Sequence, residues 1–360
     1  MGLKRISTRE DLHQYLYYAI QLEHATIPPY LTGLYSIKPG TNSDAYQAIR
    51  VVSVEEMLHL TLSANILNAV GGEPDLTQPD FIPQFPTVLP DGETDFEVNL
   101  VRFSEECVDG FMTIERADPA ESDEVKVINR NRTQNGLLPA VSGDEDAEQH
   151  FYSIGDFYAE IGRGLEFLDE EMKKSGETLF SGDPTRQITS DYYYSGGGEL
   201  IPVYDMDSAQ AAIRLISEQG EGHAGGIFDY EGELSHFHRF QQLKLGRYYQ
   251  KGDQAGQPTG PPLNVDWDAA YPIKSNARLS DYPEGSELHA AALEFNAYYY
   301  NFLVELTQSF RGQPELLIDA VGRMFRIKEL ALQLMRNPIP GTDGLNAAPT
   351  FEMPVPTEAK

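Results

Sequence analysis

The stretch VVSVEEMLHL, Val51–Leu60, decides the fold, because its apolar residues recur at three- and four-residue steps among good helix formers. Within it, Glu56 and His59 form an i, i+3 pair. On a helix this spacing places a carboxylate and an imidazole side by side, on the face that carries the apolar stripe. Glu-x-x-His pairs that face the interior of a helical bundle are typical of carboxylate-bridged metal sites, in which a neighbouring helix supplies a further Glu.

A neighbouring helix with a suitable carboxylate lies upstream. The amphipathic segment Asp11–His24 carries Glu23 on its apolar side. If the helices that hold Glu23 and Glu56 form an antiparallel hairpin, two residues at one level are equidistant from the turn, whose centre then falls in Pro39-Gly40. Pro-Gly is itself a turn signal. The pattern therefore predicts that Glu23 joins Glu56 and His59 in one metal site.

The remaining helices are predicted from periodicity and from start and stop signals. Pro28-Pro29 predicts a break or kink soon after Glu23, because proline lacks a backbone donor. Between about 74 and 140 periodicity weakens, and we expect a long irregular insertion that contains a strand at Phe96–Val101 and a short helix at Ser104–Met112. Further helices are expected at about 43–70, 145–174, from 207 onward, 286–310 and 314–336.

A second helical hairpin is expected to supply further ligands. Glu160 lies in the apolar neighbourhood of the helix at 145–174, and Glu218 and Glu221 form another i, i+3 pair. The glycine- and tyrosine-rich loop between them has its centre close to the point that an antiparallel pairing requires. Residue 221 is Glu where a symmetric site would have a second His, so His236, His223 or neither completes the site.

Composition restricts the classes of function. The chain has 360 residues, a formal net charge of −29 and a pI near 4.5, which argues against binding to nucleic acid or to an anionic membrane surface. Its single cysteine, Cys107, excludes a thiolate metal cluster within one chain, so a metal must be held by oxygen and nitrogen. No apolar run is long enough to span a membrane or to act as a signal peptide, and a cytoplasmic location is expected.

Two regions are expected. Residues 1–250 would form an all-α four-helix bundle that includes the insertion at about 74–140. Residues 251–360 would form a Gly/Pro linker and a helical hairpin packed on the bundle, followed from Ala347 by an extended tail on the surface or on a partner subunit.

Several motifs carry a resemblance to a known family. They are Leu22–Tyr30, Glu55–His59, Glu218–Gly222, Ser235–Phe240, Pro261–Trp267 and Pro338–Gly341. Together these motifs resemble the ferritin-like domain of the iminophenyl-pyruvate dimer synthases, the VioB-type enzymes of bisindole pathways. The resemblance spans most of the chain, although the VioB-type enzymes are much longer.

The resemblance implies a ferritin-like four-helix core with an iron site. Its ligands would be Glu23, Glu56, His59, Glu160, Glu218, Glu221 and His236. Carboxylates with one or two imidazoles suit one or two iron ions, or manganese. Catalytic residues beyond the ligands are not indicated.

The expected function is that of a non-haem iron oxidoreductase in secondary metabolism. It would use O2 or peroxide on a small organic substrate, such as an amino acid or its imine, and act as a homo-oligomer or beside a biosynthetic partner enzyme. Two alternatives stay open at this point. One is an iron-binding ferroxidase storage protein, and the other is a metal-free scaffold in which Glu56 and His59 belong to a buried hydrogen-bond network.

Overall fold

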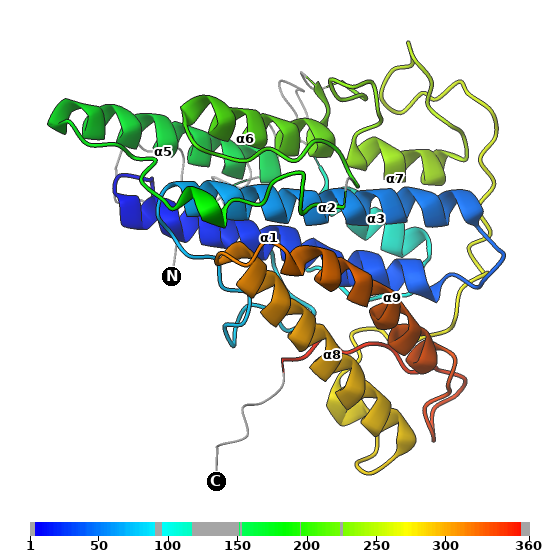
Figure 1. The fold of residues 1–360 in the computed structure, drawn as a ribbon. Coiled ribbons are helices and arrows are strands. Elements are labelled where there is room, and N and C mark those ends of the chain that lie inside the picture. Colours follow the sequence, from blue (N-terminus) through cyan, green and yellow to red (C-terminus); the bar gives the residue numbers. More distant parts are fainter. Residues whose placement is uncertain are drawn as a thin grey trace, which may run out of the picture.

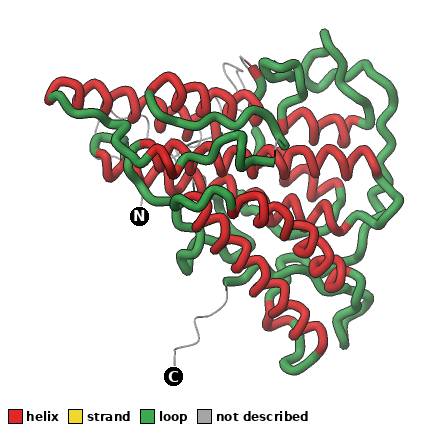
Figure 2. Tube along the Cα trace, viewed as in Figure 1, coloured by secondary structure: helices red, strands yellow, loops and turns green. Residues whose placement is uncertain are grey.

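The computed structural model of the chain describes residues 4–90, 96–116, 151, 153–194, 196–223 and 226–353. Regular structure in these residues is helical, and the β-bridges among them are isolated (Figure 1, Figure 2). The longer helices are α1 (Arg9–Ser36), α2 (Ser43–Ala69), α3 (Glu105–Ile114), α5 (Ile154–Ser175), α6 (Met206–Glu221), α7 (His236–Leu245), α8 (Glu287–Phe310) and α9 (Leu316–Met335). The prediction of an all-α fold is confirmed.

Helices α1 and α2 form a long antiparallel hairpin at the centre of the molecule (Figure 1). Thr8 caps α1: its hydroxyl accepts from the Asp11 N–H, and the Asp11 carboxylate accepts from the Thr8 N–H. The turn between the two helices includes Gly40 at φ 83°, a left-handed conformation that glycine adopts without strain. The turn therefore lies where the pairing of Glu23 with Glu56 predicts it.

Pro28 and Pro29 lie inside α1, and the helix continues through them without a break. Both prolines are buried. One turn further on, the Thr32 hydroxyl donates to the Pro28 carbonyl at 2.7 Å. Tertiary packing thus holds the helix together although two backbone donors are missing. Of the expected break or kink at this point, the break is wrong.

Four shorter helices cover one face of this hairpin. Helix α5 packs on α1 and α6 packs on α2, whereas α7 packs on α2 and α3 at the other end of the hairpin. Figure 1 shows α5 and α6 toward the left of this face and α7 toward the right. Helices α6 and α7 also contact each other. The two pairs therefore meet over the middle of the hairpin.

The insertion between α2 and α5 is largely irregular where the structure describes it. The expected strand at Phe96–Val101 is reduced to one antiparallel bridge between Thr87 and Val98. The expected short helix is present as α3, capped by the Ser104 hydroxyl. Helix α5 begins after its cap residue Ser153, and the part of the expected helix at 145–150 lies outside the described residues.

The C-terminal helices α8 and α9 pack against each other and on the hairpin, α8 against α2 and α9 against α1 (Figure 1). The segment that follows them is buried as far as Phe351 and is not a surface tail there. Ala347, Ala348 and Phe351 are each at most 2% exposed, and the Phe351 ring packs edge-on against Phe295 and Tyr299. None of the described helices is long and apolar enough to cross a membrane.

Gly182 provides a test of the packing between α2 and the loop after α5. Its N–H donates to the Ala69 carbonyl at 3.0 Å, and a Cβ at this position would lie 1.7 Å from the Asn68 carbonyl oxygen. Because backbone must move to relieve this overlap, we expect Gly182→Ala to lower the free energy of unfolding by about 1–3 kcal/mol. Urea denaturation followed by circular dichroism measures the change.

Gly110→Ala in α3 is the matched control, since nothing lies within 4 Å of its added Cβ. It should raise stability by up to about 1 kcal/mol through higher helix propensity. Equal destabilisation by the two substitutions would contradict this account of the packing.

Candidate metal centre

A cluster of buried carboxylates and imidazoles lies at the middle of the α1–α2 hairpin. Glu23 comes from α1, and Glu56 and His59 come from α2. Glu115, the C-cap residue of α3, and His236, the first residue of α7, complete the cluster. Each of these five residues is at most 4% exposed. Five donor side chains from four helices therefore converge in a site that excludes bulk water.

The first group consists of Glu23, Glu56 and His59. The His59 Nδ1 lies 3.6 Å from the Glu23 Oε2 and 3.7 Å from the Glu56 Oε1. One ligand atom from each residue lies within 4.8 Å of the other two, so a single metal ion can contact all three. The i, i+3 spacing of Glu56 and His59 on one helical face produces this geometry.

The second group consists of Glu56, Glu115 and His236, which also offer three ligand atoms within 4.8 Å of one another. The His236 Nδ1 lies 2.9 Å from the Glu56 Oε1 and 3.3 Å from the Glu115 Oε2. The rings of His59 and His236 stack with centroids 5.4 Å apart. Glu56 belongs to both groups, so its carboxylate could serve as a ligand in either of them.

Both imidazoles are held in one orientation by a second acceptor. The Gln219 side chain donates through Nε2 to the Gly197 carbonyl at 2.7 Å, which leaves its Oε1 to accept from the His59 Nε2–H at 2.8 Å. The His236 Nε2–H donates in the same way to the Glu55 Oε2 at 2.9 Å. Both histidines thus present Nδ1 to the cluster. Such outer acceptors fix the tautomer of histidines that bind metals.

Hydroxyl groups orient the three acidic ligands. The Tyr158 hydroxyl donates to the Glu23 Oε1, and the Tyr30 hydroxyl donates to the Glu115 Oε1. The Thr26 hydroxyl lies 3.1 Å from the Glu56 Oε2 and also donates to a backbone carbonyl of its own helix. Burial raises the pKa of both tyrosines well above the ordinary value, so both hydroxyls keep their protons.

The charges of the cluster favour bound cations. Burial, together with the charges of Glu115 and Glu23, raises the pKa of Glu56 to about 8. Burial disfavours the charged form of His236, but the Glu115 charge and its hydrogen bonds raise the His236 pKa well above the ordinary value. Protons therefore neutralise part of the acidic cluster in the metal-free protein. Divalent ions can replace them, because metal binding requires deprotonated ligands.

Glu23 and His59 form a pair in which each residue favours the charged form of the other. Burial disfavours the charged form of each, but their mutual attraction across 3.6 Å lowers the pKa of Glu23 and raises the pKa of His59. Carboxylate oxygens and imidazole nitrogens, without a thiolate, are a donor set that suits iron or manganese. The residues present therefore fit the metal centre that the sequence predicts.

A small cavity of about 20 Å³ adjoins the cluster, which is room for about one water molecule. It is lined by Glu23, Glu56, His59, Glu115 and His236, and on its other side by the first turn of α5 and the last turn of α6. The cluster therefore has free space on the side that faces α5 and α6.

The structure places the predicted ligands of the second hairpin differently from those of the first. The Glu160 carboxylate lies outside the cluster, where Arg163 donates to it at 2.5 Å and the Ile6 N–H at 2.9 Å. Glu218 accepts from the His223 Nδ1 at 2.9 Å, and the His223 side chain is 56% exposed. These three side chains are not brought to the centre.

Glu221 lies near the cluster without belonging to either ligand group. It lines the cavity beside the cluster, and its Oε1 accepts from the Gly155 N–H at 3.0 Å. The residue of this turn that reaches the centre is Gln219, which the sequence did not single out. Of the three histidines weighed for the second group, the structure brings His236 to it.

The sequence reasoning missed Glu115 and Glu55. Glu115 follows the apolar face of α3, Val108 and Phe111, at helical spacing, and this weak signal lies inside a region that reads as irregular. Glu55 directly precedes Glu56, so on a helix it points about 100° away and toward α7, where His236 begins.

The chain is similar to known proteins both in sequence and in structure. A sequence profile described as ferritin-like matches residues 16–245, a range that contains the whole cluster. The chain belongs to the ferritin-like family. A solved structure, described as a ferritin-like protein from Caulobacter vibrioides, matches the present chain with a TM-score of 0.61 and 24% sequence identity. The match covers 96% of the present chain and 98% of the Caulobacter chain. It shows the shared fold.

A curated relative extends the comparison beyond the bundle. Dichlorochromopyrrolate synthase from Lentzea aerocolonigenes is 25% identical across 97% of the ferritin-like chain. The chain spans 36% of that enzyme's length. The profile and this relative confirm the resemblance to the VioB-type family that the sequence motifs indicate.

The pH dependence of stability tests the electrostatics of the metal-free cluster. Glu56, His59 and His236 all have raised pKa values, so each binds its proton more tightly in the folded state than in the unfolded state. Stability from these groups is therefore present at low pH and is lost as the pH rises through their folded-state pKa values, that of Glu56 being about 8. Glu23, whose pKa is lowered, titrates below this window. We expect the Tm in EDTA to fall between pH 5.5 and 8.

Glu56→Gln removes one of these ionisations and should reduce the slope of Tm against pH in this window. Excess Mn²⁺ should also reduce the slope in the unaltered protein, since the ion takes over the role of the protons. Identical slopes for the two proteins in EDTA, measured by calorimetry, would contradict the prediction.

The role of Gln219 is tested by Gln219→Leu. The substitution removes the acceptor for the His59 Nε2–H while it keeps a side chain of similar volume. We expect Mn²⁺ affinity to fall by about 10- to 100-fold, the usual cost of losing such an outer partner. Competition with a chromogenic chelator measures the affinity. Gln210→Leu on the same helix, whose amide contacts Glu166, is the control and should leave affinity unchanged.

Proposed function

We propose that the ferritin-like chain is a non-haem metal-dependent oxidoreductase that uses O2 or peroxide on a small organic substrate. One observation carries the proposal: two buried groups of metal-ligand side chains share the carboxylate of Glu56. This arrangement is suited to two adjacent ions, as in carboxylate-bridged sites of helical bundles. Membership of the ferritin-like family and the likeness to a synthase support the same function.

Iron, with manganese as the second candidate, would be held by Glu23 and His59 on one side, by Glu115 and His236 on the other, and by Glu56 between them. Bound there, iron supplies oxidation by O2 or peroxide. Four buried carboxyl groups, those of Glu23, Glu55, Glu56 and Glu115, outnumber the adjacent cation of Arg239. Cations in the cluster would therefore remove a large electrostatic cost.

The protein's own side chains would orient the site and manage protons. Tyr158 contacts both Glu23 and the Ser63 hydroxyl, which lies 2.7 Å away, so a proton on this chain of groups can pass between Glu23 and Ser63. Tyr30 fixes the second acidic ligand, Glu115. Because the cluster is buried, the cavity beside it has room for one molecule about the size of water while bulk water stays outside.

As part of the proposal, the substrate class is an amino acid or its imine, and the setting is secondary metabolism in the cytoplasm. The relative is named as a synthase of dichlorochromopyrrolate, which supports a role in the formation of a small organic product. Because the chain spans 36% of that relative, the action of a partner enzyme or of a further copy of the chain is part of the same proposal.

Metal stoichiometry tests the proposal. After anaerobic loading with ferrous iron and desalting, we expect about two irons per chain in the unaltered protein, from the two ligand groups. Glu56→Ala should lose most of the iron because both groups use its carboxylate. His59→Ala and His236→Ala should each retain about one, since each removes a ligand of one group. Elemental analysis gives the counts.

Glu160→Ala is the matched control, because Glu160 pairs with Arg163 outside the cluster, and its iron content should equal that of the unaltered protein. Oxygen uptake with amino acids and imines then tests for turnover, which Glu56→Ala should abolish. Uptake of tens of irons per assembly without turnover would favour storage. Absence of iron above background would favour a scaffold, and either result would overturn the proposed enzyme.

A further inference from the structure

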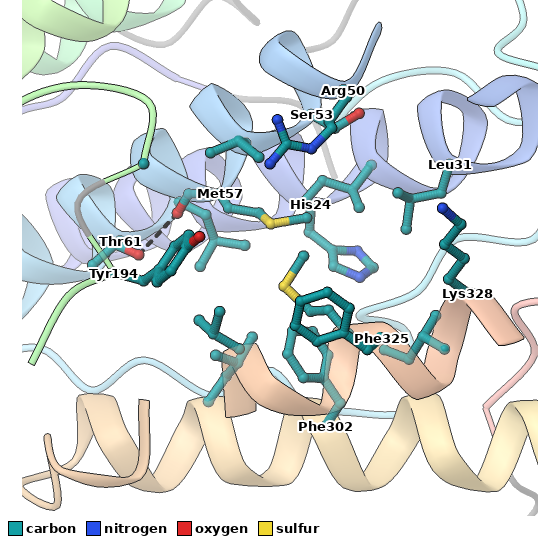
Figure 3. Close-up of a pocket in the computed structure, with 18 of the residues that line it drawn as sticks. His24, Leu31, Arg50, Ser53, Met57, Thr61, Tyr194, Phe302, Phe325 and Lys328 are labelled. Carbon is teal, nitrogen blue, oxygen red and sulfur yellow. Dashed lines mark hydrogen bonds between the residues drawn. The ribbon is translucent and has the colours of Figure 1, made fainter. Parts of the chain in front are cut away.

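A second cavity, of about 260 Å³, lies between the α1–α2 hairpin and the C-terminal helices α8 and α9 (Figure 3). Its lining is predominantly apolar and includes Leu31, Met57, Phe302 and Met324. Tyr193, Tyr194 and Gly196 close one side. A cavity of this volume and composition is typical of a small-molecule site.

The cavity opens to solvent through aromatic side chains. Phe325 and Tyr194, which both line it, are 76% and 65% exposed. Large aromatic groups exposed together beside an apolar hollow commonly mark a surface that a ligand or partner covers. Entry of a small molecule therefore requires no opening of the core.

This cavity is separate from the metal centre. None of Glu23, Glu56, His59, Glu115 and His236 lines it. The metal centre faces α3, α5, α6 and α7, whereas the cavity faces α8 and α9, so the α1–α2 layer lies between them. Since one helix is about 10 Å wide, a molecule in the cavity is out of contact with ions in the metal centre. The cavity is thus a second site.

Two cations lie at the border of the cavity. Arg50 projects from α2 and Lys328 from α9. In the view of Figure 3 their charged groups lie higher than the rings of His24, Phe325 and Phe302. Among the described residues neither cation forms an ion pair with a carboxylate. Lys328 donates instead to the Tyr46 hydroxyl at 2.7 Å and lies over its ring. In a chain of net charge −29, two cations without acidic partners beside one cavity favour an anion.

The cavity is elongated along the helices. Its lining on α1 extends from His24 to Tyr35, about 16 Å at the rise of 1.5 Å per residue. An extended aliphatic chain fits a long apolar space better than a compact polar molecule does. The flexible side chains Met57 and Met324 suit such a chain, because methionine adapts to irregular apolar surfaces.

We propose that this cavity binds an extended amphiphile with one anionic head group, of the chemical class of the fatty carboxylates. The carboxylate lies at the border and pairs with Arg50 or Lys328, and the hydrocarbon chain occupies the apolar interior along α1. The proposal does not depend on the chemistry of the metal centre.

Calorimetric titration with decanoate below its micelle concentration tests the proposal. We expect saturable binding of about one decanoate per chain, at least about tenfold tighter than binding of decyltrimethylammonium, which has the same chain and the opposite charge. Arg50→Gln with Lys328→Gln should weaken decanoate binding by about five- to tenfold, since the pairs lie at a partly exposed border, and should leave the affinity for decanol unchanged.

Arg326→Gln is the matched control. Arg326 lies on the same helix as Lys328 but pairs with Glu294 and Glu329 outside the cavity, so its loss should not change decanoate affinity. Val321→Trp fills the cavity and should abolish binding of both decanoate and decanol. Phe325→Glu, at a residue that is exposed and so tolerant of substitution, should weaken decanoate selectively.

Three results would overturn the proposal. The first is no saturable binding of decanoate to the unaltered protein. The second is equal binding of decanoate and decyltrimethylammonium, or equal loss in the Arg326→Gln control. The third is a dimer in light scattering that Phe325→Glu converts to a monomer, without decanoate binding to either form, because the cavity would then be an interface between two copies of the chain.

Discussion

The structure depends on the burial of the Glu56 carboxylate between two imidazoles. The His59 and His236 Nδ1 atoms approach the same Glu56 oxygen from different helices, at 3.7 and 2.9 Å. A carboxylate with 1% exposure cannot lie in a helical core without compensating charge, and burial among acids raises its pKa to about 8. The helices that cover this face of the hairpin each contribute a group to the cluster near one of their ends: Glu115 of α3, Tyr158 of α5, Gln219 of α6 and His236 of α7.

The α1–α2 hairpin separates two environments. Adjacent residues of α2 point about 100° apart. Glu56 therefore faces acids and imidazoles, while Met57 lines an apolar cavity. Glu23 and His24 on α1 diverge in the same way. A helix pair that is buried on both sides is apolar around most of its circumference, which explains why these helices lack a strong one-sided hydrophobic pattern.

The first half of the candidate metal centre could be predicted from the sequence because its geometry is local. The i, i+3 spacing of Glu56 and His59 and the Pro-Gly turn place them beside Glu23 without knowledge of other helices. The second half could not, because the covering layer is divided among four short helices and does not repeat the first hairpin. Glu160 fits the apolar pattern of α5, yet it forms an ion pair with Arg163, one turn later, near the surface.

The separation of the ligands along the chain has a consequence for the order of folding. His236 contacts Glu115 and Glu55 across 121 and 181 residues of sequence, whereas Glu56 and His59 lie in one helix. Contacts between distant segments form late, because closing a long loop costs entropy before any contact compensates for it. The half-site on the hairpin can therefore exist before the other half arrives, and a metal ion captured early would act as a template on which the ends of α3 and α7 are assembled.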